Sequence, residues 1–198
     1  MRLIRKATST FASVMLLIIG SMSNMSMAQS NNSPSAVIDF KQVQELDNWV
    51  IINDTVMGGR SRTQLDIEGE YLSFSGMLSL ENNGGFASIR RVYDNKSWLP
   101  DAPLQIKVKG DGREYQFRLR TNRQSDGVAY VANFTTQAEQ ESVFEFIQSD
   151  FVPQFRGRIV SGAPALNFAD IEQVGLMLAD KNPGQFTLLV EHLSQVSK

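Results

Sequence analysis

The chain has 198 residues and a formal net charge of −2, and this length suits one domain with a sizeable core. It contains no cysteine and one histidine, which excludes disulfide bonds, thiolate metal sites and a cysteine nucleophile. The mildly acidic balance argues against general binding to nucleic acid or to anionic membranes.

The first 28 residues have the layout of a secretory signal peptide: basic residues at positions 2, 5 and 6, an apolar run over 11–20, and small residues before Gln29. The apolar run is about half of the ~20 residues that a membrane-spanning helix needs, which disfavours an anchor. A mitochondrial transit peptide is also basic and free of acidic residues, but it is amphipathic rather than solidly apolar. We therefore expect a cleaved, periplasmic or secreted protein with no stable membrane insertion and a mature net charge of −5.

The mature chain is predicted to be all-β. Residues 29–35 form a polar, flexible leader, and the folded domain is expected over 36–198. Short alternating or β-rich runs, separated by turn residues, indicate a sandwich or barrel. The ten predicted strands are Val37–Phe40, Trp49–Asn53, Tyr71–Leu80, Gly85–Val92, Leu104–Lys109, Glu114–Thr121, Val128–Thr135, Ser142–Ile147, Val174–Ala179 and Gln185–His192. Helix is expected only in short pieces near Lys41–Leu46 and Ala169–Glu172.

Three glycine-containing turns are specified locally. Gly110-Asp111-Gly112 lies between two strongly alternating runs, as in a tight hairpin, because Asp-Gly tolerates positive φ angles. Residues 82–85 (NNGG) and 182–184 (NPG) are predicted to act in the same way between their flanking strands. An Asp in such a turn usually hydrogen-bonds its own backbone, which is the role expected for Asp54 and Asp111.

Nothing in the sequence marks a catalytic site. His192 is a lone histidine near the C-terminus without an evident carboxylate partner, so it cannot be assigned as a base for a Ser or Thr nucleophile. The glycine-rich segments 57–61 and 82–86 match neither a P-loop nor a dinucleotide fingerprint, and tight turns explain them. We expect no enzyme activity, no cofactor and no metal. A hydrolase built on a carboxylate pair ranks below the binding functions, and a structural calcium ion is an open alternative without a dedicated loop.

The strand alternation predicts one sheet with a polar, positively charged outer face. By the period-two rule, side chains at odd positions 115–119 enter the core and those at even positions face outward. The outward set is Arg90, Lys107, Lys109, Gln116, Arg118 and Arg120. This face is either an ordinary solvated surface or a shallow groove. In the groove, the guanidinium groups of the arginines would bind carboxylates or sugar hydroxyls, and the ring of Tyr130 or Trp49 would provide a surface on which a ligand stacks.

Five motifs, together with Trp49, resemble the complex I intermediate-associated protein 30 family. They are NDTVMGGRS (53–61), FSGMLSLENNGGFASIR (74–90), VKGDGREYQFRLRT (108–121), FVPQFRGR (151–158) and VGLMLADKNPGQFTL (174–188), and the resemblance runs from about Ile38 to Leu193. It implies a jelly-roll β-sandwich of the galactose-binding-domain-like type. Within it, the family-motif loop residues are Asn53, Asp54, Gly58, Gly59, Ser61, Gly84 and Gly85.

The resemblance also implies a function, since eukaryotic members of this family are non-catalytic assembly factors that hold intermediates of respiratory complex I. Together with the predicted signal peptide, it suggests a binding or assembly module that acts on a protein complex outside the cytoplasm. The alternative is a periplasmic carbohydrate-binding protein that uses the polar sheet face, because this fold hosts both kinds of binder. The candidate ligand residues are Arg90, Arg118, Arg120, Tyr130 and Trp49.

Overall fold

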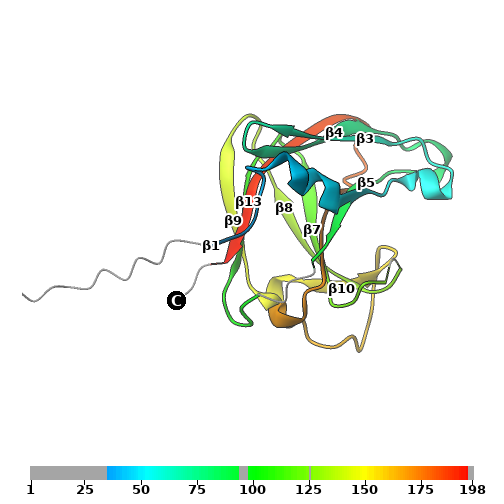
Figure 1. The fold of residues 1–198 in the computed structure, drawn as a ribbon. Coiled ribbons are helices and arrows are strands. Elements are labelled where there is room, and N and C mark those ends of the chain that lie inside the picture. Colours follow the sequence, from blue (N-terminus) through cyan, green and yellow to red (C-terminus); the bar gives the residue numbers. More distant parts are fainter. Residues whose placement is uncertain (1–34, 94–97, 125, 196–198) are drawn as a thin grey trace, which may run out of the picture. The chain divides into compact units, whose positions relative to one another are not determined.

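A computed structural model describes residues 35–93, 98–124 and 126–195, which form a sandwich of two antiparallel sheets (Figure 1). The predicted signal peptide and nearly all of the polar leader lie outside these residues. The first sheet runs in the order β3-β4-β13-β6-β9, with β1 paired to β13, and the second in the order β11-β10-β8-β7-β12-β5-β2. The strands of the first sheet are β1 (Ser35–Asp39), β3 (Arg62–Glu68), β4 (Tyr71–Leu78), β6 (Leu104–Lys109), β9 (Glu141–Phe146) and β13 (Gly184–Gln195). Those of the second are β2 (Trp49–Ile51), β5 (Ala87–Val92), β7 (Glu114–Arg120), β8 (Ala129–Thr135), β10 (Val152–Phe155), β11 (Arg158–Ile159) and β12 (Gln173–Leu178).

Helix is confined to five short 3-10 segments in the described part of the chain. These are η1 (Val43–Asn48), η2 (Asp54–Met57), η3 (Glu81–Asn83), η4 (Gln148–Asp150) and η5 (Phe168–Asp170). The all-β class and the ten predicted strands are confirmed, and η1 and η5 lie where short helices were expected. Three strands, β3, β10 and β11, were not predicted from the sequence.

The predicted hairpins are wrong, because the two strands that flank each turn lie in different sheets. The turn at 110–112 joins β6 of the first sheet to β7 of the second, so its flanking strands never pair with each other. The turns at 82–85 and 182–184 likewise connect β4 to β5 and β12 to β13 across the sandwich. Consecutive strands thus repeatedly change sheets, as in a jelly roll. Positive φ angles at Gly85, Gly112 and Gly184 show that local turn chemistry was read correctly although the partner strands were not.

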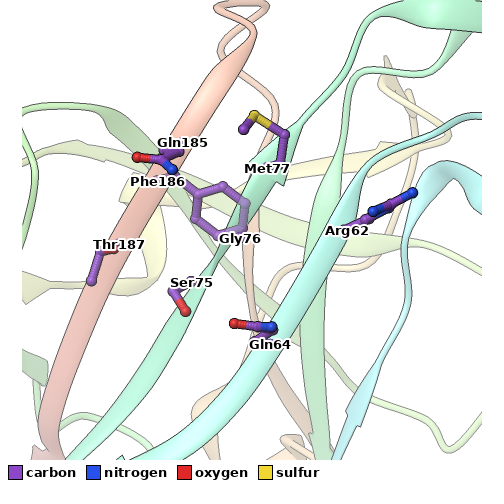
Figure 2. Close-up of a pocket in the computed structure, with 8 residues that line it drawn as sticks. All are labelled: Arg62, Gln64, Ser75, Gly76, Met77, Gln185, Phe186 and Thr187. Atoms are coloured by element: carbon purple, nitrogen blue, oxygen red, sulfur yellow. The ribbon is translucent and has the colours of Figure 1, made fainter.

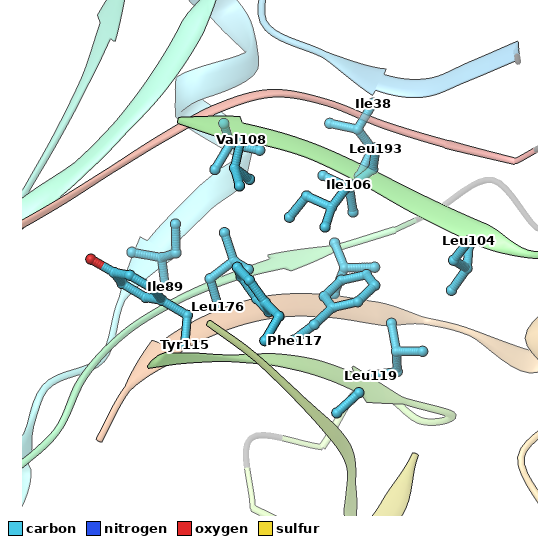
Figure 3. Packing of buried hydrophobic residues seen from close by; sticks show 14 of the residues in the cluster. Ile38, Ile89, Leu104, Ile106, Val108, Tyr115, Phe117, Leu119, Leu176 and Leu193 are labelled. Carbon is cyan, nitrogen blue, oxygen red and sulfur yellow. The ribbon is translucent and has the colours of Figure 1, made fainter. Parts of the chain in front are cut away.

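The core lies between the two sheets. Figure 3 shows side chains of β6 and β13, such as Ile106 and Leu193, facing Phe117 and Leu119 of β7 and Leu176 of β12. All five are at most 1 % exposed. Alternate residues of each strand fill this layer, so their neighbours in sequence are turned to the outer faces. This alternation fixes which side chains can form a site on the outside of each sheet.

Candidate functional site

The candidate site is the outer face of the second sheet over β5, β12 and β7, here called the arginine face. Gly175 of β12 pairs with Arg90 of β5 on one side and with Arg118 of β7 on the other. The three residues form one cross-strand row, in which Gly175 separates two arginines. In the next row, Gln173 pairs with Arg120. The structure therefore brings together all three arginines that the alternation predicted for this face.

Arg118 and Arg120 are bound by neutral groups. Arg118 donates to the side-chain oxygen of Gln116 over 2.7 Å, and Arg120 donates to the carbonyl of Gly127 over 2.6 Å. By contrast, Arg91, Arg113 and Arg156 each form an ion pair with a carboxylate. Within the described ranges, neither Arg118 nor Arg120 has such an ion pair. Their positive charge is thus not balanced by a direct carboxylate contact.

The electrostatics agree with this geometry. Burial, followed by the nearby charge of Arg90, lowers the pKa of Arg118 to about 10. Burial and the neighbouring arginines also lower the pKa of Arg120 to about 10, although Asp126 opposes the shift. Both groups remain protonated at neutral pH, in an environment that disfavours their charge. An anion bound beside them would relieve this cost.

A small hollow lies on the arginine face. It is lined by Ser88, Arg90, Arg118, Arg120, Gln173 and Gly175, among others, and holds about 20 Å³. The arginines were predicted from alternation, whereas Gln173 and Gly175 were missed as site residues. The same signal could have found them, since Gln173, Gly175 and Met177 take the outward positions of β12.

Two other expectations about this face need correction. Trp49 and Tyr130 are only 7 % and 4 % exposed, so neither offers a ring face to a ligand. The Trp49 ring nitrogen donates to Glu45, and the Tyr130 hydroxyl donates to the carbonyl of Pro164. Lys107 and Lys109 belong to β6, which lies in the other sheet, so they do not contribute to the arginine face. They were misplaced because the turn after β6 was interpreted as a hairpin.

The family-motif loop is organised around a buried carboxylate. Asp54 is fully buried and accepts hydrogen bonds from the backbone and hydroxyl of Ser61 and from the backbone N–H groups of Gly85 and Phe86. A Cβ at Gly59 or Gly84 would lie within 2.5 Å of the Asp54 side chain. Asp54 thus joins the segment 53–61 to the β4–β5 connection.

The other motif residues support the same loop. Gly58 has a φ of 90°, and Asn53 accepts a hydrogen bond from Thr63 on β3. These contacts support the architectural role proposed for Asp54, Gly58 and Gly59. They leave Asp54 no oxygen directed to an external ligand.

A second surface feature lies on the outer face of the first sheet (Figure 2). It is a shallow groove of about 400 Å³ across β3, β4 and β13. Its lining is mostly polar, with one methionine and one phenylalanine: Arg62, Gln64, Ser75, Gly76, Met77, Gln185, Phe186 and Thr187. This groove was not predicted from the sequence, because β3, which forms one side of it, was not predicted.

Other candidate chemistry was also located. His192 lies on β13 with its Nδ1 3.4 Å from Glu191. Among the described residues there is no group of three or more His, Cys, Asp or Glu side chains that could hold a metal ion. In the same part of the chain, no helix is long and apolar enough to span a bilayer.

Comparison with solved structures defines the class of fold. A family 11 carbohydrate-binding module of Clostridium thermocellum, solved with a β-1,3-1,4-mixed-linked tetrasaccharide, superposes with a TM-score of 0.61 over 83 % of this chain and 95 % of its own, at 18 % identity. An agarase superposes with a TM-score of 0.57 over 83 % of this chain and 25 % of its own, at 13 % identity. The chain is therefore a jelly-roll sandwich of the galactose-binding-like type, as expected.

Sequence comparison then gives the family. The model of complex I intermediate-associated protein 30 matches residues 38–190, so the chain belongs to this family. The mitochondrial complex I intermediate-associated protein 30 of Mus musculus is 28 % identical over 181 residues, which are 79 % of this chain and 54 % of the mouse protein. The mitochondrial protein of Drosophila melanogaster is 24 % identical over 79 % of this chain and 61 % of its own length. The chain thus spans a little over half of these relatives.

These relatives contradict the predicted location. We expected a periplasmic or secreted protein, but the named relatives from mouse, fly and Caenorhabditis elegans are mitochondrial. The expected export rested on the solid apolar block near the N-terminus, which disfavoured an amphipathic mitochondrial transit peptide. The basic, acid-free composition of that segment is common to both kinds of targeting sequence.

Proposed function

We propose that this chain is a non-catalytic binding module that holds a protein partner during assembly of a larger complex, in the manner of a complex I assembly factor. Family membership over residues 38–190 is the observation that carries the proposal. The proposed contact surface is the arginine face, because Arg118 and Arg120 carry charge that no carboxylate of the described chain neutralises by an ion pair. A charged group on a partner could supply that contact.

Affinity capture of the tagged full chain from its own cells, after mild cross-linking, tests this proposal. Subunits of a respiratory complex I intermediate should be recovered with the wild-type chain. They should be depleted with the double variant Arg90→Gln/Arg118→Gln, while Arg158→Gln on the exposed edge strand β11 serves as a control for the loss of an arginine elsewhere on the surface. Absence of complex I subunits from the wild-type capture would refute the assembly role.

A second candidate function is glycan binding, and the groove in Figure 2 is the observation that favours it. Rows of side chains from three neighbouring strands, such as Gln64, Ser75 and Thr187, line it with amides and hydroxyls. Such groups can exchange hydrogen bonds with sugar hydroxyls, and the volume of about 400 Å³ falls within the usual range of small-ligand sites. This candidate places the glycan on the first sheet rather than on the arginine face.

Calorimetric titration with a mixed-linked β-1,3-1,4-glucan tetrasaccharide tests the glycan candidate, because a structural neighbour binds that sugar. The double variant Gln64→Ala/Gln185→Ala should weaken binding about 30-fold, since each of the two lost hydrogen bonds is worth about 1 kcal/mol. The Arg158→Gln chain should bind as the wild type does. No heat of binding with the wild-type chain at millimolar sugar would eliminate this candidate for that glycan.

A further inference from the structure

We propose that Arg90 and Arg118, on either side of Gly175, form a pocket that receives a single carboxylate from an Asp or Glu side chain of the protein partner. The inference rests on the proposed partner-binding function and specifies the chemistry of its contact. It assigns Arg118 as the principal contact and Arg90 as the second arginine of the pocket.

The backbone register creates the pocket. Arg90 and Arg118 lie in one cross-strand row with one strand between them, which places their Cα atoms roughly 10 Å apart. The intervening residue is glycine, so no side chain fills the space between them. A Cβ at Gly175 would lie 2.7 Å from the carbonyl oxygen of Ile89, closer than real Cβ contacts allow. Even alanine at position 175 would therefore require the backbone to shift. The space between Arg90 and Arg118 thus depends on the glycine.

The charge of Arg118 is not balanced by an ion pair with any carboxylate of the described residues. Among the described residues, the side chain of Arg118 donates a hydrogen bond to the neutral amide of Gln116, and the charge of Arg90 acts on it unfavourably. Arg113, by contrast, is paired with a carboxylate, since it forms two hydrogen bonds with Asp180. An arginine with a like-charged neighbour and no carboxylate reduces the stability of the free protein. A bound oxyanion removes that penalty, and its oxygens can accept two parallel hydrogen bonds from the N–H groups of one guanidinium.

The size of the pocket selects the ligand. A hollow of about 20 Å³ accommodates roughly one water-sized group, which suits one oxyanion and is too small for a sugar ring. The wider polar groove on the first sheet is a separate feature. Because the proposed function concerns a protein partner, the oxyanion is a side-chain carboxylate, and free phosphate becomes an alternative outcome of the test.

Fluorescence anisotropy with labelled hexaglutamate, with hexaglutamine as the uncharged control, tests the pocket on the full-length chain. The wild type should bind hexaglutamate and not hexaglutamine. Arg118→Gln and, separately, Arg90→Gln should each weaken binding about 10- to 100-fold, because each removes charged hydrogen-bond donors. Arg158→Gln removes the same charge from exposed β11 and should change the affinity less than about twofold.

Thermal unfolding separates a binding role from a structural one. Arg118→Gln should leave the Tm of the free protein unchanged or raise it, because a buried, unbalanced charge is removed. Hexaglutamate should raise the Tm of the wild type, but not that of Arg118→Gln. A Tm several degrees lower for Arg118→Gln would show that Arg118 acts structurally and would overturn the proposal.

Three further results would also overturn it: equal hexaglutamate binding by the wild type and Arg118→Gln, an equal loss with Arg158→Gln, or stabilisation by inorganic phosphate without peptide binding. The last would identify a free-phosphate site.

The partner capture described above is read independently. If complex I subunits are recovered equally with the Arg90→Gln/Arg118→Gln chain, the pocket fails while the assembly function stands. If the wild-type chain recovers none, the assembly function fails whatever the peptide shows.

Discussion

At the scale of single residues, Asp54 shows how a buried charge is used to shape a loop. Its four hydrogen bonds come from donors on two connections that are distant in sequence. Asp54→Asn replaces one acceptor oxygen with a donor that faces other donors, so it should lower the free energy of unfolding by about 2–3 kcal/mol. Urea denaturation measures this loss. Asp66→Asn, on the exposed side of β3, should stay within about 0.5 kcal/mol of the wild type.

The same carboxylate gives a pH dependence. Burial by itself would raise the pKa of Asp54, but its hydrogen bonds to Ser61, Gly85 and Phe86 outweigh burial and hold the pKa below the ordinary value of an aspartate. Because the folded pKa is depressed, the stabilisation is present above the unfolded pKa and is lost as the pH falls through the folded value. The stability difference between wild type and Asp54→Asn should therefore be constant near neutral pH and shrink below about pH 4. A difference that grows on acidification would contradict the assigned hydrogen bonds.

At the scale of secondary-structure elements, an ion pair ties two sheet-to-sheet connections together. Arg113 follows the β6–β7 turn and holds Asp180 of the β12–β13 turn through contacts of 2.9 and 2.7 Å, and it also donates to the carbonyl of Gln185. Their side chains are only 9 % and 12 % exposed. The burial and the paired geometry make this contact part of the fold rather than a surface salt bridge.

Breaking this pair should therefore be costly. Asp180→Asn leaves the Arg113 charge without its ionised partner and should lower the free energy of unfolding by about 3 kcal/mol. The exposed pair Arg60–Glu81 provides the comparison, since its side chains are 65 % and 64 % exposed. Glu81→Gln should cost less than about 1 kcal/mol. Equal effects of the two substitutions in chemical denaturation would mean that Arg113 and Asp180 do not hold the connections together.

The three strands that were not predicted, β3, β10 and β11, show what the alternation of side chains within a short segment cannot identify. β3 alternates correctly, with Leu65 and Ile67 turned inward, but its exposed positions are charged or amide residues and it forms a sheet edge. Such a strand gains its stability from β4 and not from its own composition. β10 begins with Val-Pro and β11 has two residues, so neither offers a period long enough to recognise.

At the scale of the whole molecule, the sheet order predicts where the fold opens first. From Leu189 onward, β13 is bonded along both of its edges, to β4 and then β1 on one side and to β6 on the other. β3 and β11 lie at sheet edges. Hydrogen exchange followed by mass spectrometry should therefore find the slowest amides in β13, β12 and β7 and faster exchange in β3 and β11. Equal protection of β3 and β13 would contradict the assigned edges.

The sequence alone determined the alternation within each strand, and with it the side on which Arg90, Arg118 and Arg120 lie. It also determined the turn positions, because glycine and asparagine preferences are local properties of the backbone. Only the tertiary structure decided which strands pair, since the same short turn can close a hairpin or cross the sandwich. That pairing separated Lys107 and Lys109 from the arginines and placed Trp49 and Tyr130 in the core. It also set Gly175 between Arg90 and Arg118, because cross-strand neighbours are fixed by packing between distant segments and not by spacing along the chain.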